Sequence, residues 1–306
     1  MEVVRTLEPG LTTRPSVLTM GKFDGLHLGH QQLIGTTIER AQSLGLGSAV
    51  LTWEPHPNAV IRAGQPLELL SSLEEKIELI ARLGPDRLFV LPFTHETMTT
   101  GANVYMRQIY ATLPFRELWV GEGFAMGKNR AGDVPSLMLI GAQLGFAVGA
   151  LSKIVLGGLP VSSSRVREVL RAGDVASAHT LLDRPFGLRG IVVAGDQRGR
   201  VIGFPTANLH IDAAHVLPAD GVYACRAYLN GVGLPAVTNI GLRPTFGNLH
   251  RTVETHLLDW SGDLYGTSIR VEFLHRLRGE QKFDGIAALI AQIQHDAARA
   301  RELLRP

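Results

Sequence analysis

The stretch GKFDGLHLGH, residues 21–30, decides the fold of the first half of this chain. It follows a strand-like apolar run at residues 17–20 and opens a helical pattern that extends from residue 28 to about residue 44. A glycine-rich loop between a strand and a helix presents free backbone N–H groups to an anion. His27 and His30 fall at the first helical turn, where both imidazoles can reach one phosphate. The stretch therefore predicts a strand–loop–helix unit that binds phosphate.

Outward from this unit, short apolar runs alternate with helical patterns as far as residue 151. Strands are expected at residues 49–53, 88–91, 118–120 and 147–151, and helical segments at residues 98–112 and 137–144. Ser71 or Ser72 can cap a further helix that ends at Gly84. This order predicts an α/β, doubly wound, Rossmann-like parallel sheet with helices on both faces. Such sheets bind ligands at the carboxyl ends of their strands.

The second half of the chain has a different character. One or two short helices are expected at residues 162–182, and Pro185 and Gly187 then interrupt the pattern. Short strand-like runs follow at residues 190–194, 223–229, 236–240, 252–258 and 268–274, which favours a small antiparallel β-barrel or sandwich. The chain then ends in one helix, whose apolar stripe is expected to dock on the barrel. The stripe consists of Phe283, Ile286, Ile290, Ile293, Ala297, Ala300 and Leu304. The predicted domains are residues 1–183 and 184–306.

Composition excludes several classes of protein. The 306 residues are enough for two domains, and the formal net charge of +2 gives no reason to expect nucleic-acid or membrane binding. No apolar run reaches the ~18 residues that would span a bilayer, and the first residues do not form a secretory signal. Cys225, the single cysteine, has no partner for an internal disulfide and lies in a strand-like run, where a packed thiol is expected. We therefore expect a cytoplasmic protein, as a monomer or a weak oligomer.

Two further stretches carry phosphate chemistry. In SSSRVR, residues 162–167, the serines can be simple helix caps, but the arginines beside them favour a phosphate site. In GDQRGRVIGFPTAN, residues 195–208, glycines let the loop fold over phosphates, although a long hairpin would have similar composition. Thr206 offers a hydroxyl to Mg²⁺, and Asn208 an amide oxygen.

The pair of motifs HxGH and SSS-R-x-R resembles the nucleotidyltransferase superfamily. Together with TWEPHP at residues 52–57, VGEGFAMGKNRAGD at residues 120–133 and the GxPTAN motif, the chain resembles the bacterial bifunctional riboflavin kinase/FMN adenylyltransferases. The resemblance covers nearly the whole chain. It implies an N-terminal half that adenylylates FMN and a C-terminal barrel that phosphorylates riboflavin, each with its own ATP and Mg²⁺. ATP, riboflavin, FMN and FAD would then be the molecular partners.

The resemblance also implies roles for individual residues. His27 and His30 would stabilise the transition state at the α-phosphate of ATP, and Glu254 would be the general base for the ribityl hydroxyl of riboflavin. Thr206 and Asn208 would hold the metal ion. The expected ATP- and phosphate-binding residues are Gly21, Phe23, Asp24, Gly29, Ser163, Ser164, Arg167, Gly195, Gly203, Pro205 and Thr206. The expected flavin-binding residues are His56, Pro57, Arg243 and Arg278.

One position departs from the family. Gly123 stands where the family usually has Asn or Asp beside the metal and triphosphate, so a riboflavin kinase with an impaired adenylyltransferase is the nearest alternative. A flavin-sensing binding protein and a cytidylyltransferase are two others. A binding protein would not need the base Glu254, and the barrel argues against a cytidylyltransferase.

Overall fold

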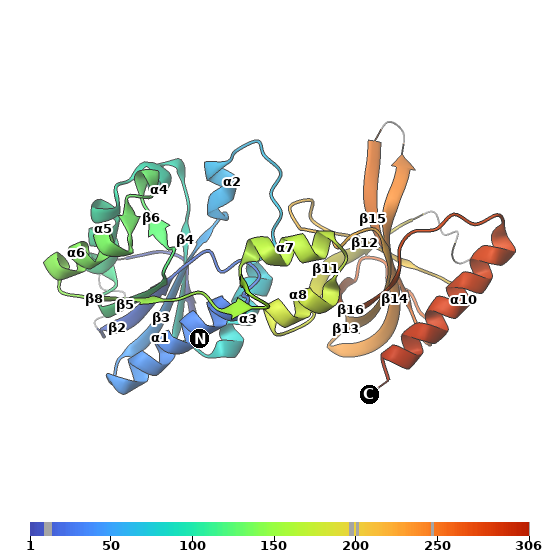
Figure 1. The fold of residues 1–306 in the computed structure, drawn as a ribbon, viewed down its shortest axis with the longest axis horizontal. Helices are drawn as coiled ribbons and strands as arrows, with labels where there is room; N and C mark the ends of the chain where they lie inside the picture. Colours follow the sequence, from blue (N-terminus) through green and yellow to red (C-terminus); the bar gives the residue numbers. More distant parts are fainter. Residues whose placement is uncertain (9–13, 196–198, 200–201, 246–247, 306) are drawn as a thin grey trace. The chain divides into compact units, whose positions relative to one another are not determined.

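The computed structural model describes residues 1–8, 14–195, 199, 202–245 and 248–305, without the side chains of residues 243–250. The chain forms two compact units, Met1–Ser163 and Ser164–Pro306, which are described separately below (Figure 1). The helical segment expected at residues 162–182 belongs largely to the second unit. The compact units and the predicted functional domains, 1–183 and 184–306, therefore do not share a boundary, and the functional division stays a prediction.

The first unit contains a six-stranded parallel sheet in the order β1-β4-β3-β2-β5-β8. Its strands are β1 (Glu2–Val4), β2 (Ser16–Met20), β3 (Gly47–Glu54), β4 (Arg87–Pro92), β5 (Phe115–Gly121) and β8 (Ala147–Leu151). Strand β2 lies in the middle, with β3 on one side and β5 on the other. The strand order reverses there, which is where doubly wound sheets bind ligands. The doubly wound fold is confirmed, and the loop at residues 21–30 leaves the sheet at this point.

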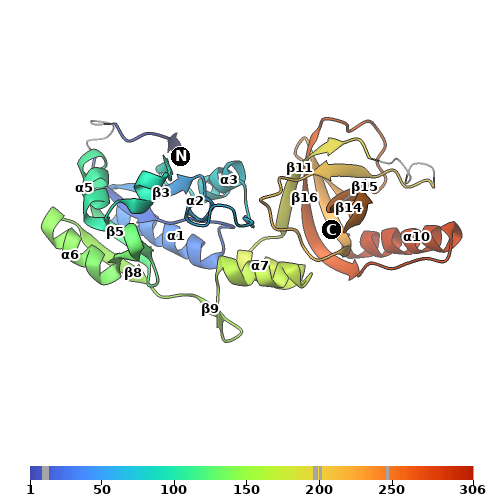
Figure 2. The same cartoon turned by 90° about the horizontal axis from the view of Figure 1, so that it is seen from above.

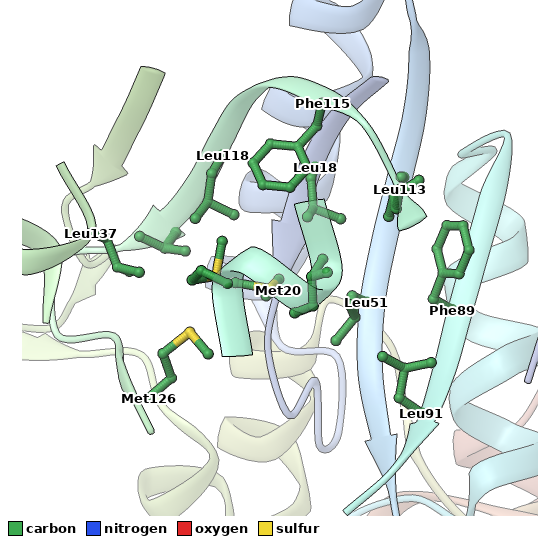
Figure 3. Close-up of a cluster of buried hydrophobic side chains, with 14 of the residues drawn as sticks. Leu18, Met20, Leu51, Phe89, Leu91, Leu113, Phe115, Leu118, Met126 and Leu137 are labelled. Carbon is green, nitrogen blue, oxygen red and sulfur yellow. The ribbon is translucent and has the colours of Figure 1, made fainter. Parts of the chain in front are cut away.

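Helices cover both faces of this sheet, because neighbouring strand residues point to opposite sides. Leu51 and Phe89 pack in the cluster under helices α5 and α6 (Figure 3), whereas Val50 and Leu88 pack under α1 and α3. The helices are α1 (Leu28–Ser43), α2 (Pro57–Ile61), α3 (Leu73–Leu83), α4 (His95–Thr99), α5 (Ala102–Thr112) and α6 (Val134–Leu144). Short pieces complete the unit: β6 (Ala125–Met126), η1 (Lys128–Arg130), β7 (Gly132–Asp133), β9 (Val155–Leu156) and β10 (Leu159–Pro160).

Two helix boundaries are instructive. Ser72 caps α3 through a capping box with Glu75, and Gly84 ends it in the left-handed conformation, as expected. The segment 98–112, expected to be continuously helical, is instead interrupted. Thr100 and Gly101 have extended backbone with ψ near 132° and 146°, so α4 ends and α5 begins afresh.

The second unit contains a closed antiparallel barrel in the order β11-β12-β15-β14-β13-β16. Its strands are β11 (Phe186–Val193), β12 (Ala207–His210), β13 (Gly221–Leu229), β14 (Val232–Thr245), β15 (Asn248–Leu257) and β16 (Ser268–Arg278). The expected barrel is thus confirmed, with one strand more than the sequence indicated. Strand β12 escapes detection because it is four residues long and follows a loop rich in glycine and proline.

Three helices accompany the barrel: α7 (Ser163–Arg171), α8 (Val175–Leu182) and α10 (Ile286–Leu303). Helix α10 packs on β13, β14 and β16 (Figure 2). Only its second half is buried, through Ala297, Ala300 and the following Leu304, while Ile286 is 67% exposed. The expectation that the whole apolar stripe docks is therefore wrong for its first turns. Apolar spacing alone cannot show where along a helix its partner ends.

Candidate active sites

The loop after β2 reaches α1 through an unusual backbone path. Phe23, Gly25 and Leu26 have φ of 48°, 76° and 40°, in the left-handed region that costs most residues energy. His27 is the N-cap residue of α1, but its side chain makes no capping hydrogen bond. The amides of the first helical turn, which have no acceptor within a helix, therefore face the loop. This geometry suits an anion at the end of the helix.

The two histidines belong to a stack of rings. The His27 and His30 rings lie 3.7 Å apart, centroid to centroid, at an interplanar angle of 19°. Phe23 meets His30 edge-on at 5.3 Å. The stack ends at two glycines, because a Cβ on Gly21 would lie 2.9 Å from Phe23 and one on Gly29 would lie 3.3 Å from His27. The glycines of the motif thus give the rings their room, and the sequence brings both imidazoles to the helix terminus as expected.

The buried carboxylate of Asp24 anchors this loop to the start of α3. Asp24 is 2% exposed, and its Oδ1 accepts a hydrogen bond from the Leu70 amide at 2.9 Å. The Gly25 amide donates to the Ser71 hydroxyl at 3.2 Å. The Ser163 hydroxyl donates to the Asp24 carbonyl at 3.0 Å. Asp24 and Ser163 thus hold the loop itself, in addition to the phosphate role that stays a prediction for both.

A buried cation balances two carboxylates beneath the loop. Lys76 of α3 is 3% exposed; burial lowers its pKa, while the carboxylates of Asp24 and Glu54 act to raise it. Burial raises the pKa of Glu54, and Lys76 counteracts that shift. Asp24 follows β2 and Glu54 ends β3, so Lys76 lies close to the ends of both strands. No motif in the sequence marks Lys76, because a lysine in an amphipathic helix usually faces solvent.

The remaining predicted residues of the first half have clear positions. His56 is 4% exposed, and its Nδ1 accepts a hydrogen bond from the Asn58 amide at 3.1 Å at the start of α2, where Pro57 is also buried. Ser164 and Arg167 lie on α7, whose first residue is Ser163. Whether these residues bind flavin or phosphate stays a prediction.

In the barrel, three polar residues lie side by side across three strands. Glu254 of β15 pairs in register with Asn208 of β12 on one side and with Asn239 of β14 on the other. Its neighbours Val253 and Thr255 are buried inside the barrel, so Glu254 points to the outer face. A carboxylate flanked by two amides forms a polar row in which a hydroxyl group and a metal ion could be held together.

The loop before β12 packs tightly against this row. A Cβ on Gly195 would lie 2.2 Å from the Asn208 amide, so a side chain there would displace it. The Phe204 amide donates to the Gly199 carbonyl at 2.8 Å, and Gly203 has φ of 87°. Glycine is thus required for the shape of the loop that carries Thr206.

The two predicted flavin-binding arginines of the barrel differ in what can be said of them. The side chain of Arg243 lies outside the described residues. Arg278 donates to the buried carboxylate of Asp296 at 2.9 Å and lies over the ring of Phe283 at 5.7 Å. In this structure Arg278 fastens the start of the C-terminal segment to α10, and a flavin contact stays a prediction.

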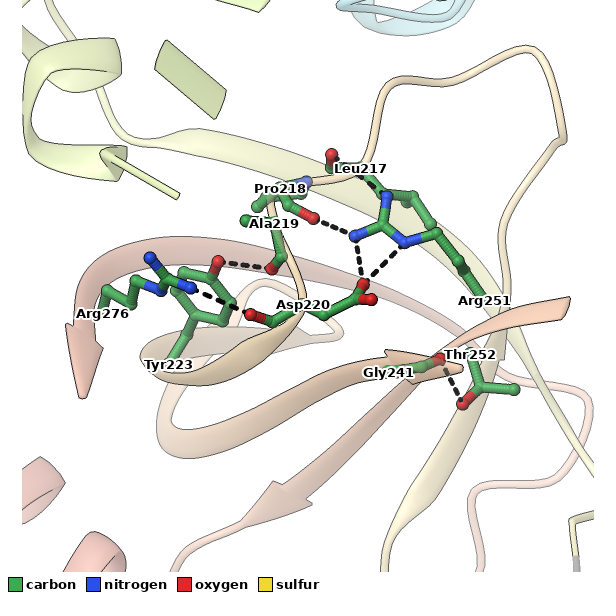
Figure 4. A network of polar contacts seen from close by, with 9 residues as sticks. All are labelled: Leu217, Pro218, Ala219, Asp220, Tyr223, Gly241, Arg251, Thr252 and Arg276. Carbon is green, nitrogen blue, oxygen red and sulfur yellow. Dashed lines mark hydrogen bonds and ion pairs between the residues drawn. The ribbon is translucent and has the colours of Figure 1, made fainter. Parts of the chain in front are cut away.

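A network that sequence reasoning missed fixes the connection between β12 and β13 (Figure 4). Arg251 of β15 donates to Asp220 at 2.8 Å, and Arg276 of β16 donates to the Asp220 carbonyl at 3.0 Å. The Tyr223 hydroxyl donates to the Ala219 carbonyl at 2.6 Å. Lone arginines on strands give no sequence signal for such a network, because its partners are backbone groups of a loop.

Within the residues that the structure describes, no group of three or more His, Cys, Asp or Glu side chains is arranged to hold a metal ion. Thr206 and Asn208 would instead supply neutral oxygens, as Mg²⁺ accepts when phosphate oxygens complete its shell. The donor set therefore fits a metal that arrives with a nucleotide.

Comparison with known proteins decides between the alternatives. The family model described as FAD synthetase matches residues 11–165, and the one described as riboflavin kinase matches residues 182–304. The chain belongs to the family of bifunctional riboflavin kinase/FMN adenylyltransferases. The relative of that name from Bacillus subtilis is 37% identical over 93% of this chain and 91% of its own length. The Escherichia coli relative is 37% identical over 94% of this chain and 92% of its own length.

A solved structure agrees with this assignment of the fold. It is titled macrolide-efflux protein from Streptococcus pneumoniae, and it superposes with a TM-score of 0.86 at 27% identity over 98% of this chain and 99% of that chain. In the described part of this chain, none of the helices is long and apolar enough to cross a membrane. Both catalytic domains of the family are present, and nothing in the comparisons indicates an impaired adenylyltransferase.

Proposed function

We propose that this family member uses the two sites described above for two successive reactions. At the barrel, the ribityl hydroxyl of riboflavin attacks the γ-phosphorus of ATP, which gives FMN and ADP. At the parallel sheet, a phosphate oxygen of FMN attacks the α-phosphorus of a second ATP, which gives FAD and pyrophosphate. The observation that carries the proposal is that the base candidate Glu254 and the stacked pair His27/His30 lie in different compact units.

The adenylyl transfer needs charge stabilisation more than proton removal. The phosphate of FMN is already a nucleophile at neutral pH, and the developing charge at the α-phosphorus would meet His27, His30 and the first-turn amides of α1. Ser163, Ser164 and Arg167 would bind the phosphates that leave as pyrophosphate. His56 and Pro57 would contact the flavin.

The kinase reaction does need a base. Glu254 would accept the proton of the ribityl hydroxyl while Thr206 and Asn208 hold Mg²⁺ against the ATP phosphates. The register that places Asn208 directly beside Glu254 supports this division of roles. Mg²⁺ is the metal we propose, because all the donors offered here are oxygens. The single cysteine supports a cytoplasmic location, and we propose a monomer or a weak oligomer.

Product analysis with riboflavin or FMN as substrate tests both assignments. Glu254→Gln should lower FMN formation by about 10²–10⁴-fold and leave FAD formation from supplied FMN unchanged. His27→Ala should do the reverse, so each variant is the folding control for the other. Loss of both activities in either variant would refute the assignment of two separate sites.

Gly123 provides a second outcome in the same experiment. A Cβ there would lie 3.8 Å from the Lys153 side chain, an ordinary contact, so asparagine fits without rearrangement. If the wild-type protein stops at FMN and does not convert supplied FMN, Gly123 limits the adenylyltransferase, and Gly123→Asn should restore it.

A further inference from the structure

His256 is a residue to which the sequence assigns no role. It follows Glu254 by two positions on β15, with the buried Thr255 between them, so His256 and Glu254 point to the same outer face of the barrel. Its Nδ1 lies 2.7 Å from the Pro205 carbonyl oxygen. Because a carbonyl only accepts, Nδ1 carries the hydrogen of this bond. The Phe204 ring meets the imidazole edge-on, with centroids 5.6 Å apart.

The contact extends the pairing of β12 with β15 into the phosphate loop. The last ladder pair in register is Ala207 with Thr255, so the hydrogen bond from His256 lies one step further along, at the level of Thr206. Pro205 has no N–H group, and its carbonyl is its only backbone hydrogen-bonding group. Holding that carbonyl fixes the peptide plane between Pro205 and Thr206 and therefore the direction in which Thr206 leaves the loop.

We propose that His256 is a positioning residue of the phosphoryl-transfer site, which holds the Pro205 carbonyl and thereby fixes Thr206 relative to Glu254. The inference rests on the proposed kinase function of the barrel. One strand then supplies both the base, at Glu254, and the clamp on the opposing loop, at His256. This arrangement ties the distance between base and metal ligand to the fixed spacing of residues along β15.

Other tethers of the loop do not replace this bond. The bond between the Phe204 amide and the Gly199 carbonyl joins two parts of the same loop and does not connect it to β15. Gly195 packs against Asn208, which already belongs to the ladder. Among the bonds described here, that from His256 is the one that connects Pro205 to the strand carrying Glu254.

The test uses the full-length protein with His256→Ala and His256→Asn. An asparagine amide can occupy the place of Nδ1 and donate the same bond, so it should rescue what alanine loses. His275→Ala is the matched control, because His275 is exposed on β16 of the same barrel. The measurements are kcat and KM of FMN formation at varied MgATP and Mg²⁺, FAD formation from supplied FMN, and amide hydrogen exchange of residues 202–208.

We expect His256→Ala to lower kcat/KM for MgATP in the kinase reaction about 10–100-fold, as removal of groups that orient metal ligands does. It should also raise the Mg²⁺ concentration needed for half-maximal rate and speed exchange of residues 202–208. His256→Asn should recover most of the kinase activity. FAD formation from supplied FMN should stay unchanged in all variants, which shows that the chain is folded.

Three results would overturn the inference: kinase kinetics of His256→Ala like those of the wild type, exchange of residues 202–208 unchanged, or His256→Asn as impaired as His256→Ala. A wild-type protein that forms no FMN would instead refute the proposed kinase function. In that case the exchange measurement still decides whether His256 holds the loop.

Discussion

Gly29→Ala should separate activity from stability in the adenylyltransferase. A Cβ at this position would lie 3.3 Å from Cε1 and 3.4 Å from Nδ1 of His27, closer than the ~3.5–4.0 Å at which such atoms pack best. The His27 ring must therefore move by about 0.2–0.5 Å. Since a misplacement of ~1 Å can cost ~100-fold in rate, we expect FAD formation from supplied FMN to slow about three- to tenfold.

The same substitution should not weaken the fold. Gly29 lies in the first turn of α1 and has ordinary helical backbone, and alanine in place of glycine in a helix gains roughly 0.5–1 kcal/mol. Gly35 is the matched control in the same helix, because a Cβ there would meet no other described group within 4 Å. Gly35→Ala should raise stability by a similar amount and leave the rate unchanged.

The assay combines steady-state adenylyltransferase kinetics with urea unfolding of both variants, and FMN formation serves as an internal control. A wild-type rate for Gly29→Ala would refute the reasoning that the spacing of the stacked rings matters for catalysis. A loss of rate accompanied by a loss of stability would show that the change had damaged the fold instead.

Three further outcomes are expected. Burial raises the pKa of the Cys225 thiol to about 12, so a thiol reagent at pH 8 should modify Cys225 only as fast as the barrel unfolds; rapid modification of the native protein would contradict this. The hydrogen bond from Arg40 lowers the pKa of Glu117 below its ordinary value. Its stabilising effect is therefore present above the ordinary glutamate pKa and is lost as pH falls through the lower folded value, and acid unfolding of Glu117→Gln should lack this component. Asp296→Ala leaves the Arg278 guanidinium, 15% exposed, without its carboxylate and should destabilise the barrel unit by about 3 kcal/mol; a calorimetric midpoint equal to that of the wild type would show that solvent replaces the pair.

The sequence predicts the architecture well because local patterns and global fold agree in this chain. Strands of the parallel sheet are buried on both faces and read as short apolar runs, as at Val50 and Leu51. The histidine loop is predictable for the same reason, since residues between one strand and the next helix are fixed in space by both. The barrel strands alternate in burial, which is a second clear signal, as Glu254 between two buried neighbours illustrates.

What the sequence could not supply is the set of long-range contacts that orient the sites. Lys76 lies on a helix 52 residues after Asp24 in the chain, and the spacing carries no sign that burial will bring their charges together. His256 meets Pro205 across 51 residues for the same reason. Such contacts depend on which strands become neighbours, and single-sequence patterns report the elements but not their pairing.

The closure of the barrel by its last strand sets an order of events during synthesis. β16 pairs with both β11 and β13, so the ring cannot close until residue 278 has left the ribosome. The residues of the first unit are all available long before that, and domains generally fold as units while the chain is still growing. A chain that stopped short of β16 would expose the unpaired edges of β11 and β13, which are templates for aggregation. Nascent chains interrupted between residues 230 and 268 should therefore depend most on chaperones.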